Sequence, residues 1–457
     1  MTKHSDRLNY DNKIILAPMV RVGTLPMRLL SLQYGADIVY SEELIDWKLL
    51  KSVRRVNDAL GTIDYIDRSD GTVVFRTCAA EKDRVVVQIG TCDPQRALKV
   101  GKMIENDIAG IDINMGCPKE FSLKGGMGAA LLTQPEKAKA ILSILVKNVK
   151  VPVTCKIRVF ESVEDTIKLV KDLASTGIAA IAIHGRTKYE RPQHWNRNTA
   201  IAAIAQEVDI PVIANGGSRE IDRYTDILKF KQNCGASSVM VARTAEGNCS
   251  IFCPQGLKNL EDVITDYLKL AIDYDNSPSN TKYCVQNMLK ELQETPRGKR
   301  FLECQTLEQI CSIWNLGDYC RQKQLEFQSK GMLGRRDVTP DMFNNISNKK
   351  IKLDFDNSNI YELKCAFIRV NFPKDPDLPK SKLIVYCGKN KLKVPTYSII
   401  REDKLFRAVA TLDGKKYSSS YWEKNKRFAE QGAALACCVA LGLIDRQNLI
   451  NNGSILE

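Results

Sequence analysis

Eight short apolar runs between residues 13 and 243 constrain the fold of this 457-residue chain more than any other feature. The runs are residues 13–19, 36–42, 84–90, 110–117, 152–159, 178–186, 210–217 and 237–243. Most are continuously apolar rather than alternating, as expected for parallel strands that are buried on both faces. Amphipathic stretches such as 94–106 and 163–176 lie between them and predict helices. The pattern predicts an α/β fold with a (β/α)8 TIM barrel.

An open, doubly wound parallel sheet is the alternative architecture for such a pattern. The count of eight runs argues against it, as does the lack of a Gly-x-Gly-x-x-Gly motif after the first run. We therefore expect a closed barrel over residues 10–254.

Several predicted strands end in polar, reactive or glycine residues. Examples are Asn114-Met115-Gly116-Cys117 and Asn215-Gly216-Gly217. In a barrel all strand ends of this kind meet at the carboxyl-terminal face, where active sites are built. Seven such ends on one rim are hard to explain by packing alone, so the sequence predicts a functional site there.

The rest of the chain predicts three further segments. Residues 255–336 predict a helical domain, with helices at 257–274, 281–292 and 307–315. The polar stretch 337–360 predicts a linker. Residues 361–445 predict an α-β-β-β-α domain with a helix at 378–388, strands at 396–401, 405–412 and 416–420, an Asp413-Gly414 hairpin turn, and a final helix at 422–441.

The charge distribution indicates a polyanionic partner. The chain has 67 Lys and Arg against 54 Asp and Glu, a net charge of +13. Residues 361–457 hold 17 Lys and Arg against 10 Asp and Glu, which places +7 of this excess near the C-terminus.

Cysteine usage and hydropathy bear on the compartment. Fifteen scattered cysteines in a chain without an apolar leader favour reduced thiols in the cytoplasm. The longest apolar runs are too short for a membrane-spanning helix, so we expect no membrane partner. With only three histidines and no paired Cys motif, we expect no metal.

The last two strand ends have the chemistry of a phosphate site. Glycines in Asn215-Gly216-Gly217 allow backbone N–H groups to approach a phosphate, and Arg243 after Ala242 supplies positive charge. Lys156 is placed to neutralise a flavin ring that becomes anionic on reduction, and His184 to hydrogen-bond a cofactor. These features favour a phosphorylated cofactor or substrate.

Cys117 is the candidate reactive group. It follows the fourth predicted strand and precedes a glycine-rich loop, Lys124-Gly125-Gly126-Met127-Gly128. That loop lacks the Gly-Lys-Ser/Thr ending of a nucleoside-triphosphate loop, so a site of that kind is not supported.

Taken together, these motifs resemble those of the tRNA-dihydrouridine synthases over residues 13–300. The motifs are Ala17-Pro18-Met19, Asn114-Met115-Gly116-Cys117-Pro118, Cys155-Lys156-Ile157-Arg158, His184-Gly185-Arg186-Thr187 and Asn215-Gly216-Gly217. The C-terminal segment resembles a double-stranded-RNA-binding domain. In combining the barrel with such a domain, the chain resembles the animal dihydrouridine synthase 2 subfamily.

The resemblance implies bound FMN, NADPH as reductant, and tRNA as substrate, with uridine 20 of the D-loop as the target base. It implies that Cys117 donates a proton to C5 of the uracil while C6 receives hydride. The residues it assigns to the flavin are Ala17, Pro18, Met19, Gln88, Asn114, Lys156, His184, Asn215, Gly216, Gly217, Ala242 and Arg243. Glu42 and Glu43 end the second predicted strand, and no role follows for either of them.

Basic residues outside the barrel are the candidates for RNA binding. They are Arg297, Lys299, Arg300, Lys364, Lys374, Lys424, Lys426 and Arg427. The last three lie near the start of the final helix, where cations and the helix N-terminus suit phosphate oxygens. Glu430 stands in this helix where the family pattern has a cation.

Two other functions stay open from the residues alone. One is a flavin oxidoreductase that acts on a free pyrimidine, and the other is a non-enzymatic RNA-binding protein with an inactive barrel. The basic tail argues against the first and the intact Cys117 against the second. We expect a monomeric enzyme.

Overall fold

The computed structural model describes residues 8–330, 332, 360–402, 405–423 and 425–455. These residues form two compact units, built mainly from the chain up to Leu316 and from Gly317 onward. The predicted linker falls almost wholly outside the described residues. The domain boundaries drawn from the sequence stay a prediction.

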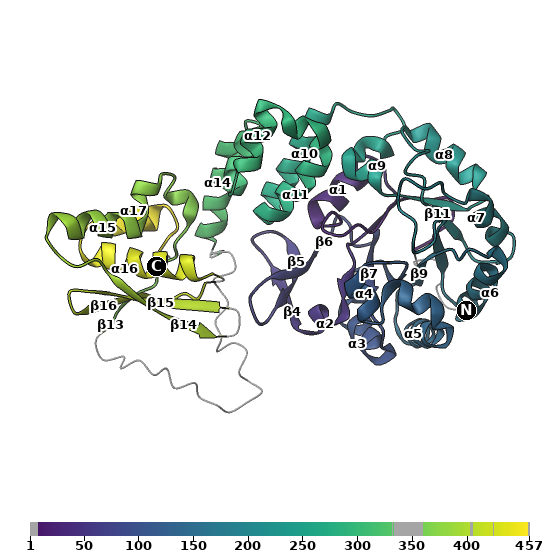
Figure 1. Cartoon of the computed structure of the whole chain (residues 1–457), viewed down its shortest axis with the longest axis horizontal. Coiled ribbons are helices and arrows are strands. Elements are labelled where there is room, and N and C mark those ends of the chain that lie inside the picture. Colours follow the sequence, from purple (N-terminus) through teal and green to yellow (C-terminus); the bar gives the residue numbers. More distant parts are fainter. Residues whose placement is uncertain (1–7, 331, 333–359, 403–404, 424, 456–457) are drawn as a thin grey trace. The chain divides into compact units, whose positions relative to one another are not determined.

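Eight parallel strands close into a barrel in the first unit (Figure 1). They are β1 (Ile14–Leu16), β2 (Ile38–Tyr40), β7 (Val85–Gly90), β8 (Gly110–Met115), β9 (Val153–Arg158), β10 (Ala180–His184), β11 (Val212–Asn215) and β12 (Ser238–Val241). The first strand pairs with the last, and β2 pairs with β7, so the sheet has no gap. Each predicted run contains one of these strands, which confirms the barrel and excludes the open sheet.

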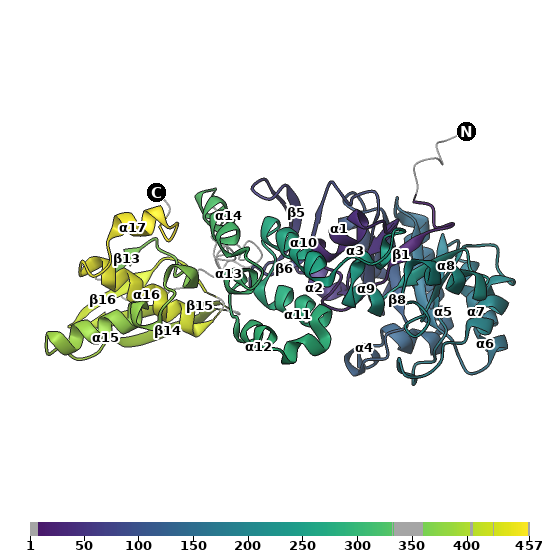
Figure 2. The ribbon, with the colours of Figure 1, turned by 90° about the horizontal axis from the view of Figure 1, so that it is seen from above.

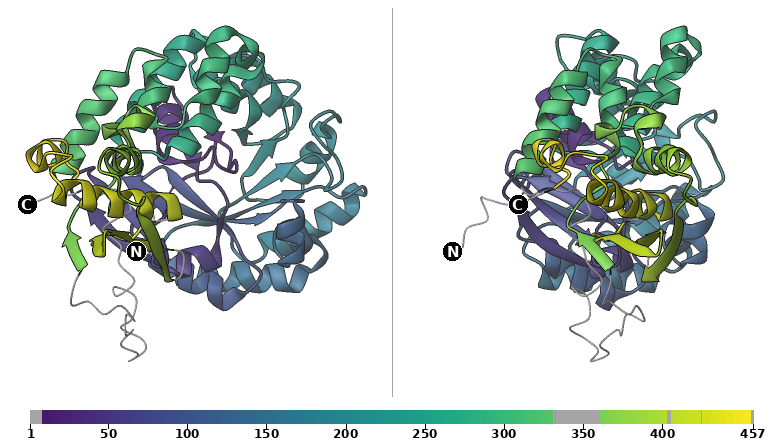
Figure 3. Two further views of the ribbon diagram at one scale, coloured as in Figure 1. Left: turned by 60° about the vertical axis from the view of Figure 1, so that its left-hand side comes forward. Right: turned by 90° about the vertical axis from the view of Figure 1, so that its left-hand side faces the viewer.

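Helices surround the strands on the outside of the barrel (Figure 3, left). They are α1 (Leu25–Gln33), α3 (Pro94–Ile104), α4 (Glu120–Lys124), α5 (Pro135–Asn148), α6 (Val163–Ala174), α7 (Asn198–Ala205), α8 (Tyr224–Asn233) and α9 (Arg243–Gly247). The short helices η1 (Gly128–Thr133) and η2 (Cys249–Phe252) follow α4 and α9 in the chain. Because these helices cover the sheet, all six residues of β7 and of β8 are buried.

An insertion between β2 and β7 was not predicted. It contains β3 (Leu44–Ile45), α2 (Asp46–Leu50) and a sheet of β4 (Ser52–Asn57), β5 (Thr62–Asp67) and β6 (Val73–Cys78). Charged side chains interrupt its strands, as at Arg54 and Arg55 in β4, so they do not read as apolar runs.

The predicted helical region is confirmed and begins with α10 (Leu260–Asp273) and α11 (Pro278–Leu289). It continues through η3 (Lys290–Glu294), α12 (Pro296–Glu303) and α13 (Leu307–Ser312). Asp266 of α10 accepts a hydrogen bond from Tyr34 at 2.9 Å, which fastens this region to the barrel. Helix α14 (Gly317–Ser329) belongs to the second unit.

The C-terminal domain has the predicted α-β-β-β-α order. Its elements are α15 (Pro379–Lys389), β14 (Thr396–Glu402), β15 (Leu405–Leu412), β16 (Lys415–Ser419) and α16 (Lys426–Ala440). Helix α16 packs on β15 and β16 and beside α15 (Figure 2). The strand β13 (Ile360–Leu363), the turns η7 (Arg369–Asn371) and η8 (Asp375–Asp377), and α17 (Arg446–Asn451) were not predicted.

The predicted start of the last helix at residue 422 is wrong. Helix α16 begins at Lys426, because the Asn425 side chain caps it by accepting the Phe428 N–H at 2.8 Å. Glu423 instead pairs with Phe406 through two backbone hydrogen bonds, so the chain is still extended there. The Asp413-Gly414 turn is confirmed, since both residues have positive φ, as a two-residue hairpin of this type requires.

Candidate active site

A cavity of about 610 Å³ opens at the carboxyl ends of the barrel strands. Seven of the residues predicted from the sequence line it: Cys117, His184, Asn215, Gly216, Gly217, Ala242 and Arg243. These residues come from the ends of β8, β10, β11 and β12, so the predicted meeting of strand ends is present in the structure.

Six other predicted residues lie in, or directly after, strands of the same barrel but do not line this cavity. They are Ala17, Pro18, Met19, Gln88, Asn114 and Lys156. The Ala17 N–H donates to the Val241 carbonyl at 2.9 Å, which places the end of β1 beside the end of β12.

Asn114 joins the reactive segment to the interior of the barrel. Its Oδ1 accepts the backbone N–H groups of Gly116 and Cys117 at 2.9 and 3.0 Å. Its Nδ2 donates to Gln88 Oε1 at 3.3 Å, and Gln88 donates to buried Asp112 at 2.8 Å. This amide therefore fixes the turn that presents Cys117 and also orients Gln88.

Lys156 and Asp112 are the charged groups beneath the cavity. Burial and neighbouring Arg158 lower the pKa of Lys156 to about 8, while the Asp112 carboxylate opposes that change. Burial raises the pKa of Asp112 to about 6, against the hydrogen bonds that it accepts from Gln88 and Thr154. Near neutral pH, Lys156 is therefore a cation that loses its proton on mild alkalinisation.

Cys117 differs from most cysteines of the chain in being partly exposed. All fifteen lie in the described residues, and thirteen are buried; Cys92 is the other exception. Burial and the Glu43 carboxylate raise the pKa of the Cys117 thiol, and Lys119 only partly offsets this. The group is therefore a protonated thiol at neutral pH, which suits an acid rather than a nucleophile.

Glycine at position 128 is required by the close fit of the chain around Cys117. Gly128 has φ +57°, and a Cβ atom there would lie 2.7 Å from the Cys117 carbonyl oxygen and 3.0 Å from its Cβ. Any larger side chain would displace the cysteine.

The sequence reasoning left Glu42 and Glu43 without roles, and the structure separates them. Glu42 accepts the backbone N–H of Arg21 at 2.8 Å, which is a structural contact. Glu43 lies beside the Cys117 thiol, and burial raises the pKa of its carboxyl. The sequence signal for Glu43 was its position, since it is a charged residue next to the end of a predicted strand.

Two arginines of the cavity wall were not among the predicted site residues. Arg158 donates to the Gly116 carbonyl and to the Thr187 carbonyl, both at 2.9 Å. Arg186 is 2% exposed and donates to the Gly216 carbonyl at 2.7 Å. Both residues lie in motifs quoted above, Arg158 at the end of Cys155-Lys156-Ile157-Arg158 and Arg186 within His184-Gly185-Arg186-Thr187, so the sequence did contain a signal for them.

The cavity is electrostatically positive. Burial and the charges of Lys156, Arg158, Arg186 and Arg243 lower the pKa of His184 well below its ordinary value. Burial, together with the charges of Arg191 and Arg186, lowers the pKa of Arg158 to about 10. The neutral imidazole and the crowded guanidinium groups form a site that favours an anion.

At the end of β11, Asn196 and His184 pack directly against the backbone of Gly216, so no side chain fits there. Gly216 has φ +113°, and a Cβ there would lie 2.0 Å from Asn196 Oδ1 and 2.9 Å from His184 Cδ2. Asn196 Oδ1 is buried and has no hydrogen-bond partner among the described residues. Backbone without side chains, flanked by Arg243 and His184, fits a phosphorylated cofactor such as FMN.

The candidate RNA-binding residues differ in their surroundings. Arg297 pairs with Glu261 at 2.9 Å and stacks on Trp314, so its charge already has an internal partner. The exposed candidates are Lys299, Arg300, Lys364, Lys374, Lys426 and Arg427. Lys424 lies outside the described residues. Glu430 pairs with Lys380 at 2.6 Å.

No helix in the described parts of the chain has the length and apolar character needed to cross a membrane. No group of three or more His, Cys, Asp and Glu side chains within those same residues is arranged to hold a metal ion.

Comparison with known proteins identifies the family. The profile described as "Dihydrouridine synthase (Dus)" matches residues 15–309, and that described as "Double-stranded RNA binding motif" matches residues 379–441. A "tRNA-dihydrouridine(20) synthase [NAD(P)+]" of Schizosaccharomyces pombe is 39% identical over 293 residues, which is 62% of this chain and 60% of the relative. The protein of the same name from Saccharomyces cerevisiae is 37% identical over 325 residues, 67% of this chain and 84% of the relative.

A solved structure titled "Crystal structure of tRNA-dihydrouridine(20) synthase dsRBD domain" is 33% identical and covers 19% of this chain and 95% of that chain, with a TM-score of 0.19. The first profile spans the barrel and most of the helical region, and it includes every predicted flavin residue and Cys117. This chain therefore belongs to the dihydrouridine synthase family.

Proposed function

We propose that this protein is a tRNA-dihydrouridine synthase that reduces the C5–C6 double bond of uridine 20 in the D-loop of cytoplasmic tRNA. The observation that carries the proposal is a protonated thiol, Cys117, at the mouth of a cationic cavity in a barrel of this family. The two yeast relatives carry this activity and NAD(P)+ in their names. We further propose that the protein acts as a monomer, with FMN as cofactor and NADPH as reductant.

Residues at the cavity and beside it would hold the flavin. Gly216, Gly217 and Arg243 would contact its phosphate, while Lys156 and His184 would lie toward its ring system. Ala17, Pro18, Met19, Gln88, Asn114, Asn215 and Ala242 complete the proposed set. When bound, FMN supplies the hydride that C6 of the uracil receives.

Cys117 would act as the general acid. Burial and the Glu43 carboxylate keep the proton on its Sγ, from which it passes to C5 of the uracil. The hydrogen bonds from the Gly116 and Cys117 N–H groups to Asn114 hold the thiol segment in place for this transfer. Glu43, whose own pKa is raised, lies where it can return a proton to the thiol after turnover.

The target uridine must leave its base stack to reach the cavity. That extrusion costs least in a loop, and binding energy from the rest of the tRNA offsets it. Exposed Lys299 and Arg300 on α12, and exposed Lys364, Lys374, Lys426 and Arg427 in the C-terminal domain, would supply phosphate contacts. Lys424, which lies outside the described residues, and Arg297 remain predictions of the same kind.

The experiment that tests this proposal combines absorbance with product analysis. The purified full-length chain, incubated with NADPH and unmodified tRNA, should show flavin absorbance and add two hydrogens to one D-loop uridine, as detected by mass spectrometry. Cys117→Ala should bind FMN and tRNA normally but lose most of the product in a single turnover.

Three outcomes would contradict the proposal in different ways. Equal product from Cys117→Ala would remove the general-acid role. A yellow protein that spares tRNA but reduces free uracil would favour a small-molecule oxidoreductase. A protein that cannot be loaded with FMN, yet binds tRNA, would favour a non-enzymatic role.

A further inference from the structure

Two large aromatic side chains project from the segment that follows β10. Tyr189 is 76% exposed and Trp195 is 68% exposed. Each has a cation over its ring: Lys188 Nζ lies 5.0 Å from the centroid of Tyr189, and the Arg219 guanidinium lies 4.3 Å from that of Trp195. Aromatic rings left in water beside cations mark a surface that is suited to a ligand with both flat rings and negative charge.

The segment that carries these two side chains also lines the candidate active site. The same segment contributes Glu190, Arg191 and Pro192 to the cavity wall, between Tyr189 and Trp195 in sequence. The two exposed rings are therefore one to three residues away in sequence from side chains of the cavity wall.

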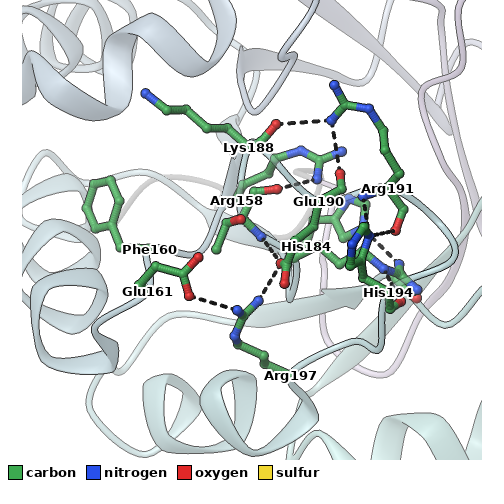
Figure 4. Close-up of polar contacts among 12 residues, drawn as sticks. Arg158, Phe160, Glu161, His184, Lys188, Glu190, Arg191, His194 and Arg197 are labelled. Atoms are coloured by element: carbon green, nitrogen blue, oxygen red, sulfur yellow. Dashed lines mark hydrogen bonds and ion pairs between the residues drawn. The ribbon is translucent and has the colours of Figure 1, made fainter.

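The segment is held in one conformation by polar contacts with the barrel, most of which Figure 4 shows. Buried Arg186 donates to the His194 carbonyl at 2.8 Å, and Arg158 donates to the Thr187 carbonyl at 2.9 Å. Arg197 pairs with Glu161 at 2.9 Å and with Glu190. The aromatic surface is therefore organised before a ligand arrives, which reduces the entropy that binding must remove.

The charge on this surface is positive toward solvent. Its one acidic residue, Glu190, accepts the Thr187 N–H at 2.7 Å and pairs with Arg197, so its charge is used within the segment. Arg219 also donates to the Gln193 carbonyl at 2.7 Å, which fixes its guanidinium next to Trp195. Arg191 adds a further cation to the segment and donates to the Lys188 and Glu190 carbonyls at 3.2 and 3.1 Å.

We propose that residues 188–195 and Arg219 form a stacking surface for unpaired nucleotides of the tRNA next to the target uridine, with bases placed on Tyr189 and Trp195 and phosphates beside the cations. Aromatic rings interleaved with cations are the general means of binding single-stranded nucleic acid, because every base has a stacking face. This inference rests on the proposed function and names the part of the tRNA that the rim of the site contacts.

The test measures tRNA affinity for aromatic variants of the FMN-loaded full-length protein. Tyr189→Ala and Trp195→Ala should each weaken binding of unmodified tRNA about tenfold, because each removes the stacking of a base. Tyr189→Phe and Trp195→Phe keep a ring and should bind nearly as wild type. Leu228→Ala, which removes an exposed apolar side chain from α8, is the matched control and should have no effect.

Two further readouts make the result specific. Flavin absorbance and NADPH oxidation without tRNA should be unchanged in all variants, because neither aromatic residue lines the cavity. A blunt RNA duplex of similar length should bind wild type and the alanine variants equally, because its bases are not available for stacking.

Unchanged tRNA affinity in the Tyr189→Ala, Trp195→Ala double variant would overturn the stacking surface, as would an equal loss of affinity for the duplex. A wild-type protein that binds tRNA but forms no dihydrouridine would instead contradict the proposed function, since the affinities would still report on the surface.

Discussion

Raising the pH from 7 to 9 should weaken FMN binding through a single residue, Lys156. Its pKa is lowered from 10.5 to about 8 by burial and by Arg158, a difference worth about 3 kcal/mol. Within the folded protein, Lys156 is charged below pH 8 and neutral above it. An anionic ligand beside the amine favours the charged form, so binding is tighter on the acid side.

The size of the effect follows from proton linkage. If bound FMN returns the pKa of Lys156 to about 9, the Kd for FMN rises about 5-fold between pH 7 and pH 9; if it returns the pKa to 10.5, the rise is about 10-fold. The folding equilibrium changes in the opposite sense. Because the folded pKa lies below the unfolded one, the unfolded state binds more protons between pH 8 and 10.5, and Lys156 makes the cofactor-free protein more stable as pH rises through this window.

Three other site groups with shifted pKa values keep their charge in this range. His184 is already neutral, Arg158 has a pKa of about 10, and Asp112, with a pKa of about 6, is ionised. The pKa of the Cys117 thiol is raised above its ordinary value of 9.0. The second ionisation of a phosphate group has a pKa near 6, so it is about nine-tenths complete at pH 7.

The assay is titration of the cofactor-free protein with FMN, followed by flavin fluorescence at fixed ionic strength from pH 7 to 9. Lys156→Met should bind more weakly at pH 7 and show no pH dependence. Lys156→Arg should keep its charge, and with it a Kd that does not change with pH. A wild-type slope that persists in Lys156→Met would refute the reasoning, because another group would then be responsible.

Three further outcomes are expected. Deleting residues 361–457 should raise the Kd for tRNA, measured by filter binding, more than it slows NADPH oxidation; unchanged affinity would end the proposed division of labour. Glu430→Gln releases Lys380 from its ion pair and removes a negative charge, so tRNA should bind a few-fold more tightly at low salt, and a loss of affinity would contradict this. Arg28→Met leaves buried Glu81 without its ion-pair partner and should lower the free energy of unfolding, measured in urea, by about 3–5 kcal/mol. Adding Glu81→Leu should recover part of that loss, and equal stability of the wild type and the single variant would refute the reasoning.

The barrel was predictable because its strands lie between helices and the closed sheet, and such strands must be apolar throughout. The apolar composition of the eight runs was therefore enough to predict the barrel. The β4–β6 sheet gave no comparable pattern, since arginines at positions 54 and 55 interrupt β4 and Asp64 and Asp67 interrupt β5. Its order depends on long-range pairs, such as Arg76 with Asp64 at 2.6 Å, that local sequence does not reveal.

The site was predictable to the extent that it consists of strand ends. Cys117, His184 and Gly216 meet because parallel strands bring their carboxyl ends to one rim. Side-chain packing between different elements places Glu43 beside Cys117 and pairs Arg297 with Glu261. The only sequence signal for Glu43 is its place next to a predicted strand end, and nothing near Arg297 in the sequence marks it as internally paired.

Arg158 links the turn that carries Cys117 to the segment that carries Tyr189 and Trp195. Its guanidinium donates to the carbonyl of Gly116, directly before Cys117, and to that of Thr187, directly before residues 188–195. Neither strand end can shift without stretching a charge-assisted hydrogen bond to the other. A base that stacks on the proposed surface would therefore be held against the same barrel framework that carries the Cys117 thiol.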